Sequence, residues 1–161
     1  MRIARLLAPL LALALALPPA ACGGDDDVTA PTLATVETTT FAPSLGVDLT
    51  AAGWTRTPSG LYYRILSPAP DTARTVANGQ TLSVRYTGWL ATGRQFQSST
   101  HTFTLGRGNV IAGWDLGIAG MRVGERRRLL IPPALGYGIE GDRGIPGNAV
   151  LVFDVEVLSA R

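Results

Sequence analysis

Two stretches of alternating apolar and polar residues constrain the fold of this chain more than any other feature. In residues 81–90, Leu82, Val84 and Tyr86 fall on one face of a strand, with polar residues between them. Residues 149–158 alternate in the same way. Because successive side chains of a strand point to opposite faces, this pattern predicts strands that are covered on one side. Nineteen Gly and eleven Pro add many turns, so we expect short strands rather than long helices.

One short helix is expected beside these strands. Residues 112–119 place Trp114 and Ile118 four positions apart, in one stripe that can dock on a sheet. Two glycines lie in this segment, so its stability should come from packing rather than from helix propensity. The pattern predicts an α+β domain, with a curved antiparallel sheet of about five strands wrapped around the helix. The other strand segments are expected at residues 61–66, 95–98, 102–105 and 126–131.

The N-terminus has the pattern of an export signal. Residues 1–5 carry two Arg, residues 6–17 are apolar apart from one Pro, and small residues precede Cys22. The apolar stretch is too short for a convincing membrane span. A lone cysteine after small residues resembles a bacterial lipobox, in which the cysteine is acylated and becomes the mature N-terminus, although Pro19 stands where Leu is usual. The alternative is ordinary cleavage, which would leave Cys22 as a free thiol without a disulfide partner.

The chain is therefore interpreted as four parts. Residues 1–21 form a signal peptide, residues 22–40 a flexible acidic tether, residues 41–59 an N-terminal extension that packs loosely, and residues 60–161 the folded domain. With lipid on Cys22, we expect the protein to be anchored at the periplasmic face of a bacterial membrane.

The charge distribution argues against nucleic-acid binding. Residues 22–52 carry five acids and no base, whereas residues 53–161 carry twelve Arg and seven acids. The chain from Cys22 onward is therefore nearly neutral. Its only run of Arg, at residues 126–128, leads into an apolar strand and is expected to be solvated.

The motifs do not support metal, nucleotide or acid–base chemistry. The chain has one His and one Cys, in different regions, whereas a catalytic metal needs several converging ligands. The segment Gly106-Arg107-Gly108 lacks the Gly-Lys-Ser/Thr of a phosphate loop. His101 has no nucleophile elbow or orienting acid and is expected in a surface loop. We therefore expect neither a cofactor nor a catalytic metal.

A scattered set of aromatic and branched apolar residues, each in a Gly-rich frame, remains as the candidate site. If these residues converge, they line an apolar pocket without covalent machinery; the alternative is ordinary core packing. Tyr86 and Tyr137 are the better functional candidates, because a buried Tyr hydroxyl needs a partner. The set comprises Tyr86, Phe96, Val110, Ile111, Trp114, Tyr137 and Phe153.

In their order and context these residues resemble the FKBP-type peptidyl-prolyl cis/trans isomerases, over residues 60–158. The family fold, a bent antiparallel sheet wrapped on a short helix, agrees with the pattern above. The motifs that carry the resemblance are Tyr-Thr-Gly, Phe-Xaa-Ser-Ser, Phe-Xaa-Leu-Gly, Val-Ile-Xaa-Gly-Trp, Gly-Met-Xaa-Val-Gly-Glu, Gly-Tyr-Gly and Leu-Val-Phe-Asp-Val-Glu.

The resemblance implies a role for each residue. Trp114 would form the pocket floor under a prolyl ring, and the backbone N–H of Ile111 and the hydroxyl of Tyr137 would hydrogen-bond substrate carbonyls. Ile145 would cover the rim, and Phe103 would also contact substrate. The walls would be Tyr86, Phe96, Val110, Ile111 and Phe153.

One position departs from the family pattern. Members usually carry Asp directly after the wall Phe, whereas this chain has Gln97. The loop after Ser99 is also short and lacks the Arg that pairs with that Asp, so the acid and its partner are missing together. We expect Gln97 to hydrogen-bond without a fixed charge, and tacrolimus-type macrolides to bind with reduced affinity.

The resulting hypothesis is a monomeric, membrane-anchored prolyl isomerase. It would act on Xaa-Pro segments of unfolded or partly folded exported proteins. Two alternatives stay open: a catalytically weak FKBP-fold module that holds Pro-containing partner segments, and a structural lipoprotein whose pocket is filled.

Overall fold

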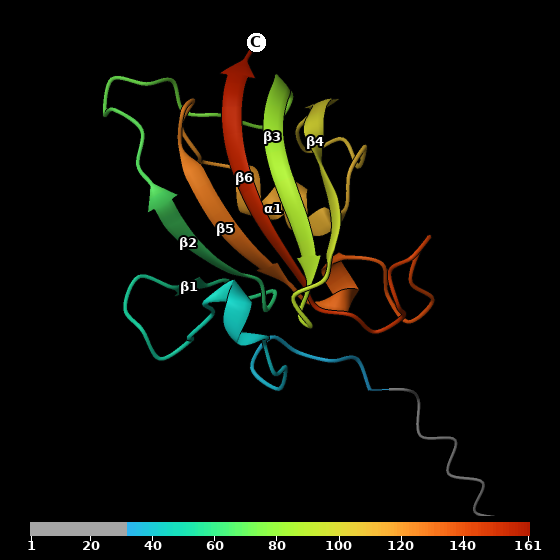
Figure 1. Cartoon of the computed structure of the whole chain (residues 1–161). Helices are drawn as coiled ribbons and strands as arrows, with labels where there is room; N and C mark the ends of the chain where they lie inside the picture. Colours follow the sequence, from blue (N-terminus) through green and yellow to red (C-terminus); the bar gives the residue numbers. More distant parts are fainter. Residues whose placement is uncertain (1–31) are drawn as a thin grey trace, which may run out of the picture. The chain divides into compact units, whose positions relative to one another are not determined.

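The computed structural model describes residues 32–161, so the signal segment and Cys22 lie outside the described residues. A single antiparallel sheet of six strands organises this part of the chain, and it curves around one helix without closing (Figure 1). The strand order is β1-β2-β5-β6-β3-β4. The elements are η1 (Pro43–Leu45), β1 (Thr55–Arg56), β2 (Tyr62–Ser67), β3 (Thr81–Leu90), β4 (Gln95–Thr104), α1 (Ala112–Ile118), β5 (Arg126–Ile131), η2 (Pro133–Leu135) and β6 (Leu151–Ala160).

The main core lies between α1 and the sheet. Leu82 and Val84 of β3 are fully buried there, as the alternation predicts, and Ile118 of α1 is fully buried against them. The predicted α+β class and the helix are confirmed. The sixth strand is β1, whose two residues are too few to leave a periodic signal in the sequence.

The two glycines of α1 allow the helix to approach the sheet. A Cβ at Gly113 would lie 2.4 Å from Cγ2 of Ile131, and one at Gly117 would lie 2.8 Å from Cδ2 of Leu129. Gly113 therefore allows close packing on the branched side chain of Ile131, whereas at Gly117 the end of the Leu129 side chain would have to shift; this packing outweighs the poor helix propensity of glycine.

Strand β4 is longer than expected. In place of two short strands with His101 in a loop between them, one strand spans Gln95–Thr104 and pairs with β3 along its length. The sequence obscured this because residues 97–102 are exposed, so they carry no apolar alternation. Pairing with a neighbouring strand, rather than local propensity, decides such a segment.

The opposite face of the sheet is covered by residues 34–54. A second cluster of buried side chains forms there, with Val36 fully buried although it lies in the range 22–40 that the sequence suggested as a tether. Leu130 pairs with Val152 in the sheet, and both point into this cluster. The buried members are Val36, Leu45, Leu130, Val150 and Val152.

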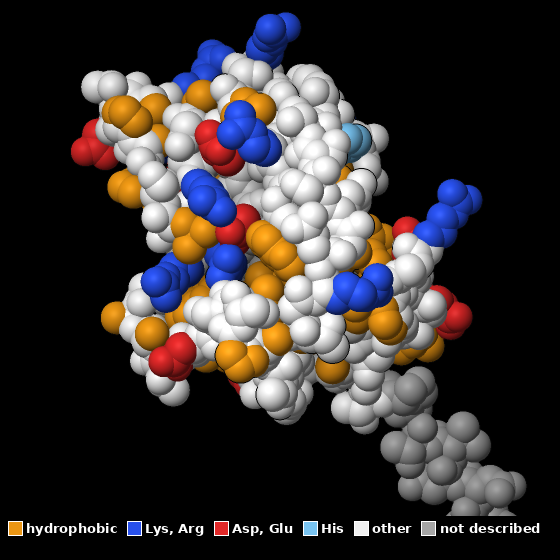
Figure 2. Space-filling view, in the orientation of Figure 1, with side chains coloured by type: hydrophobic (Ala, Val, Ile, Leu, Met, Phe, Trp, Pro, Cys, Tyr) orange, Lys and Arg blue, Asp and Glu red, His pale blue; other side chains and the backbone are white. Residues whose placement is uncertain are grey.

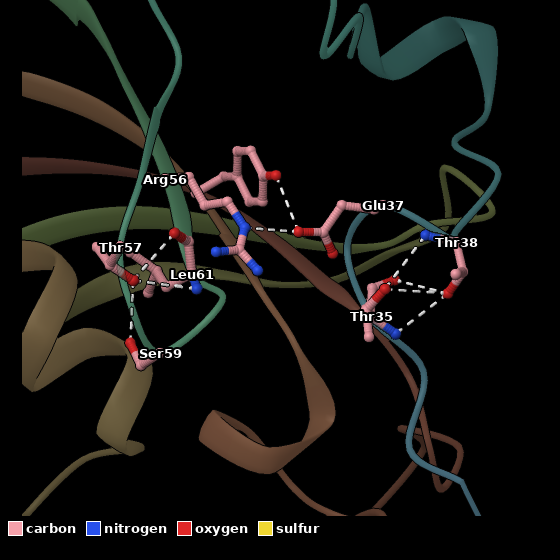
Figure 3. A network of polar contacts seen from close by, with 8 residues as sticks. Thr35, Glu37, Thr38, Arg56, Thr57, Ser59 and Leu61 are labelled. Atoms are coloured by element: carbon pink, nitrogen blue, oxygen red, sulfur yellow. Dashed lines mark hydrogen bonds and ion pairs between the residues drawn. The ribbon is translucent and has the colours of Figure 1, made fainter.

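A polar network ties the extension to the first two strands (Figure 3). The Glu37 carboxylate accepts hydrogen bonds from Nε of Arg56 at 2.7 Å and from the Tyr62 hydroxyl at 2.9 Å. The Arg56 bond, with the Tyr62 bond adding to it, lowers the pKa of Glu37 to about 2. The extension is therefore held by both apolar and ionic contacts.

The Arg run at the start of β5 is largely paired. Arg127 is buried on the helix side, where it binds Glu125 at 2.7 Å and donates to the Gly117 carbonyl at 2.9 Å. On the other face, Arg126 and Arg128 share Asp154, at 2.8 and 2.6 Å. Figure 2 shows this face, where basic and acidic side chains lie side by side instead of forming one positive patch.

Candidate functional site

A pocket of about 240 Å³ lies on the helix side of the sheet. Strands β3, β4 and β6, the start of α1, the loop before it and the loop after η2 each contribute to its wall. The lining residues are Tyr86, Gln97, His101, Asn109, Val110, Ile111, Trp114, Tyr137 and Phe153.

Trp114 forms the aromatic centre of this pocket. Its ring centroid lies 4.8 Å from that of Tyr86 and 5.4 Å from that of Phe153, and both partners stand nearly perpendicular to the indole. Perpendicular aromatic pairs are favourable because a ring edge meets a ring face. The Trp114 Nε1 is buried, and no hydrogen-bond acceptor for it exists in the described part of the chain. Among the described residues, the indole is thus held by packing.

Seven of the ten described candidates line the pocket; the other three support it or lie beside it. Phe96 braces Phe153, with ring centroids 5.6 Å apart, and Phe103 packs behind Trp114 at 5.8 Å. Ile145 is 8% exposed and belongs to the main core. The seven are Tyr86, Gln97, Val110, Ile111, Trp114, Tyr137 and Phe153. The functional roles of all ten stay predictions.

A bulge and a glycine bring Phe96 and Gln97 to this end of the sheet. Gly88 pairs with Gln97 and Trp89 pairs with Gln95, so Phe96 is an extra residue in β4. Such a bulge redirects side chains that would otherwise alternate. A Cβ at Gly88 would lie 2.7 Å from both Phe96 and Phe153, so only glycine leaves room for the two rings.

The loop before α1 is held by Asp115. Its carboxylate accepts hydrogen bonds from the N–H of Gly106 at 2.8 Å and of Gly108 at 3.1 Å. Both glycines have positive φ, which turns these amides toward the acid. Ile111 follows in an extended conformation as the N-cap of α1, and its carbonyl accepts the Trp114 N–H at 2.9 Å.

The two pocket tyrosines stay protonated at neutral pH. Burial raises the pKa of Tyr86, and burial together with the charge of Asp142 raises the pKa of Tyr137. A protonated phenol can donate a hydrogen bond to a carbonyl oxygen. The site can therefore bind a ligand against its rings and donate hydrogen bonds to it from the two phenols. No nucleophile is paired with a base among the lining residues.

His101 and Asn109 line the pocket and were not predicted. His101 was expected in a surface loop; it lies on β4, and its ring stacks on Phe103 with centroids 5.8 Å apart and 13° between planes. A signal was present, because Gln97 and His101 are four positions apart and share a face if the strand continues. The described residues contain no group of three or more His, Cys, Asp or Glu that could hold a metal ion.

Residues 72–158 match the family model described as FKBP-type peptidyl-prolyl cis-trans isomerase, which covers more than half of the chain. The chain belongs to this family. FK506-binding protein 2B of Rhizopus delemar is 51% identical over 109 residues, which are 63% of this chain and 51% of that protein. Peptidyl-prolyl cis-trans isomerase FKBP53 of Arabidopsis thaliana is 46% identical over 110 residues, which are 65% of this chain and 23% of that protein.

A solved structure shows the same fold. The crystal structure of FkpA from Escherichia coli superposes with a TM-score of 0.63 at 33% identity, covering 69% of this chain and 53% of that one. The matches thus span about half or less of these FKBP-type relatives. Within residues 32–161, no helix is long and apolar enough to cross a membrane.

Proposed function

We propose that this chain catalyses cis/trans isomerisation of Xaa-Pro peptide bonds in the pocket around Trp114. The observation that carries the proposal is the arrangement of Tyr86 and Phe153 at nearly right angles to the Trp114 indole, three aromatic rings on which a prolyl ring would pack. Membership of the isomerase family supports it.

The chemistry needs a shaped site rather than a proton carrier. Rotation about an Xaa-Pro bond faces a barrier of about 18–20 kcal/mol because the planar amide is resonance-stabilised. An apolar pocket disfavours the polar planar amide relative to the twisted transition state, and shape complementarity adds differential binding. Each tenfold gain in rate requires only about 1.4 kcal/mol of this preference.

Three groups would position the substrate. The prolyl ring would lie on Trp114, and the Ile111 N–H and the Tyr137 hydroxyl would donate to the flanking carbonyls. Gln97 would offer a neutral hydrogen-bonding edge in the place where the sequence resemblance leads one to expect Asp.

A protease-free exchange assay on an Ala-Leu-Pro-Phe peptide tests the proposal. The full chain, purified in a mild detergent, should accelerate isomerisation at micromolar concentration. Absence of any acceleration would refute the activity.

Gln97 in the pocket wall favours one second candidate, a binding module that holds Pro-containing segments. A neutral amide accepts weaker hydrogen bonds than a carboxylate, so this edge would hold the substrate less firmly in the twisted geometry. Peptide binding without any change in isomerisation rate would select this function over catalysis.

The proposed setting is the periplasmic face of a bacterial membrane, with a lipid on Cys22 as anchor. Its support is the sequence of residues 1–22. The substrates would then be unfolded or partly folded exported proteins, and the protein would act as a monomer. A mass shift on Cys22 in membrane-expressed protein is expected, and membrane partitioning of Cys22→Ser equal to that of wild type would contradict lipidation.

A further inference from the structure

Asn148 joins the start of the described chain to the loop that carries Tyr137. This Asn lies in the loop between η2 and β6. Its Oδ1 accepts a hydrogen bond from the Ala34 N–H at 2.7 Å, and its Nδ2 donates to the Thr32 carbonyl at 3.3 Å. One amide side chain therefore pairs with both a donor and an acceptor of the N-terminal extension.

The backbone of Asn148 is bound to the segment next to Tyr137. Its N–H donates to the Gly138 carbonyl at 2.8 Å. A Cβ at the preceding Gly147 would lie 1.9 Å from the Ile139 carbonyl oxygen, so the two sides of the loop are in close contact. Asn148 is also the one non-glycine residue with positive φ among residues 32–161, at 59°. Asn adopts this region more readily than most residues, so side chain and conformation both suit this position.

The N-terminal extension that Asn148 contacts is itself held against the sheet. Two residues after Ala34, Val36 is fully buried against the sheet, and Glu37 is held by Arg56 and Tyr62 (Figure 3). The chain from Val36 onward is therefore fixed to the sheet. Because Asn148 is hydrogen-bonded to the residues just before Val36, the loop that contains Asn148 is restrained as well.

We propose that Asn148 is a positioning residue, through which the N-terminal extension holds the Tyr137 loop in its substrate-binding position. The inference rests on the proposed isomerase function. A loop that is already ordered loses less entropy when substrate binds, so the contact should lower KM more than it raises kcat. The rings of Tyr86, Trp114 and Phe153 lie on other elements, so their contribution to the rate should be unaffected.

Three variants of the full chain separate positioning from general stability. Asn148→Gly keeps the positive φ and removes both side-chain bonds. Asn148→Asp keeps the acceptor for the Ala34 N–H but loses the donor to the Thr32 carbonyl, so it is a partial rescue that tests the Ala34 bond by itself. Val157→Ala is the matched control, because it opens a cavity in the main core near the other end of β6 from the loop, where Val157 pairs with Val84 of β3. Each is assayed for kcat and KM with the Pro peptide and for amide hydrogen exchange in residues 136–148.

For Asn148→Gly we expect KM to rise about fivefold, because the 2.7 Å bond to Ala34 contributes about one net hydrogen bond and the 3.3 Å bond to Thr32 is long and adds little. The kcat should stay within about twofold of wild type. Exchange in residues 136–148 should accelerate. Asn148→Asp should give values of KM and loop exchange between those of Asn148→Gly and wild type, and Val157→Ala should lower stability while leaving KM and loop exchange unchanged.

Unchanged KM and unchanged loop exchange in Asn148→Gly would overturn the inference, as would an equal KM rise in Val157→Ala. If the wild type accelerates no peptide, the proposed function has failed on its own. The peptide dissociation constant and the loop exchange of Asn148→Gly then decide: weaker binding with faster exchange supports the positioning role, and wild-type values refute it.

Discussion

The rings of Tyr86 and Trp114 stand nearly perpendicular, with centroids 4.8 Å apart and 80° between their planes. Both side chains are more than nine-tenths buried. The pair joins β3 to the first turn of α1, so the same contact that stabilises the core also shapes the pocket. A pair of this kind contributes about 0.5–1.5 kcal/mol beyond the burial of its area.

Replacement of Trp114 should affect both activity and stability. We expect Trp114→Ala to abolish peptide isomerisation and to lower the free energy of unfolding by about 3–5 kcal/mol, because a large buried ring is lost. Trp114→Phe should keep part of the isomerase activity and part of the stability. Activity and urea unfolding, measured on the same preparations, check this. Wild-type kcat/KM in folded Trp114→Ala would show that the pocket lies elsewhere.

Gln97→Asp should raise affinity for tacrolimus-type macrolides or raise the isomerisation rate. A carboxylate at this edge accepts stronger hydrogen bonds than an amide, by about 1 kcal/mol, which corresponds to about fivefold. Gln97→Asn is the neutral control of the same length as Asp. The dissociation constant of the macrolide and the isomerisation rate of the peptide are measured for both variants. Equal affinities and equal rates for Gln97→Asp and Gln97→Asn would contradict a polar role for this edge.

The ion pair of Glu37 should make stability depend on pH. The pKa of Glu37 is lowered from 4.5 to about 2 in the folded chain, mainly by the Arg56 bond. A lowered pKa means that the contribution is present above pH 4.5 and is lost as pH falls toward 2. Because the carboxylate is 38% exposed, solvent screening limits the effect to under about 1 kcal/mol.

Urea unfolding of wild type and Glu37→Gln at pH 7 and pH 2 tests this sign. The variant should be less stable at pH 7, and the difference should be smaller at pH 2, where about half of the Glu37 carboxylates are protonated. Glu140→Gln is a suitable control, because Glu140 makes no ion pair in residues 32–161. A difference that grows as pH falls would contradict the assignment.

Gly113→Ala should destabilise the protein although Ala is the better helix former. The gain in helix propensity is about 1 kcal/mol, whereas forcing a methyl group to within 2.4 Å of Ile131 costs about 1–3 kcal/mol. The shift of α1 away from β5 should also weaken peptide binding. Thermal unfolding checks the sign, with Leu116→Ala as control at a half-exposed position of the same helix. A stabilised Gly113→Ala would show that the helix can move without cost.

The alternating strands, the helix and the aromatic set were all visible in the sequence. Each depends on a local pattern: the two-residue period of β3 and β6, and the spacing of Trp114 and Ile118 on α1. The sequence motifs also indicated the family. They identified Phe96 and Phe103 as candidate site residues, but they could not predict where these two rings lie around the pocket.

The sequence by itself determined which residues are apolar, on which face they fall and which chemistry is absent from the motifs. Only the tertiary structure decided that β4 runs unbroken and brings His101 to the pocket, that Phe96 braces Phe153, and that Asn148 meets Ala34. The physical reason is that a local period reports the side on which a residue lies, whereas strand pairing, bulges and contacts between distant segments depend on which surfaces the whole chain buries together.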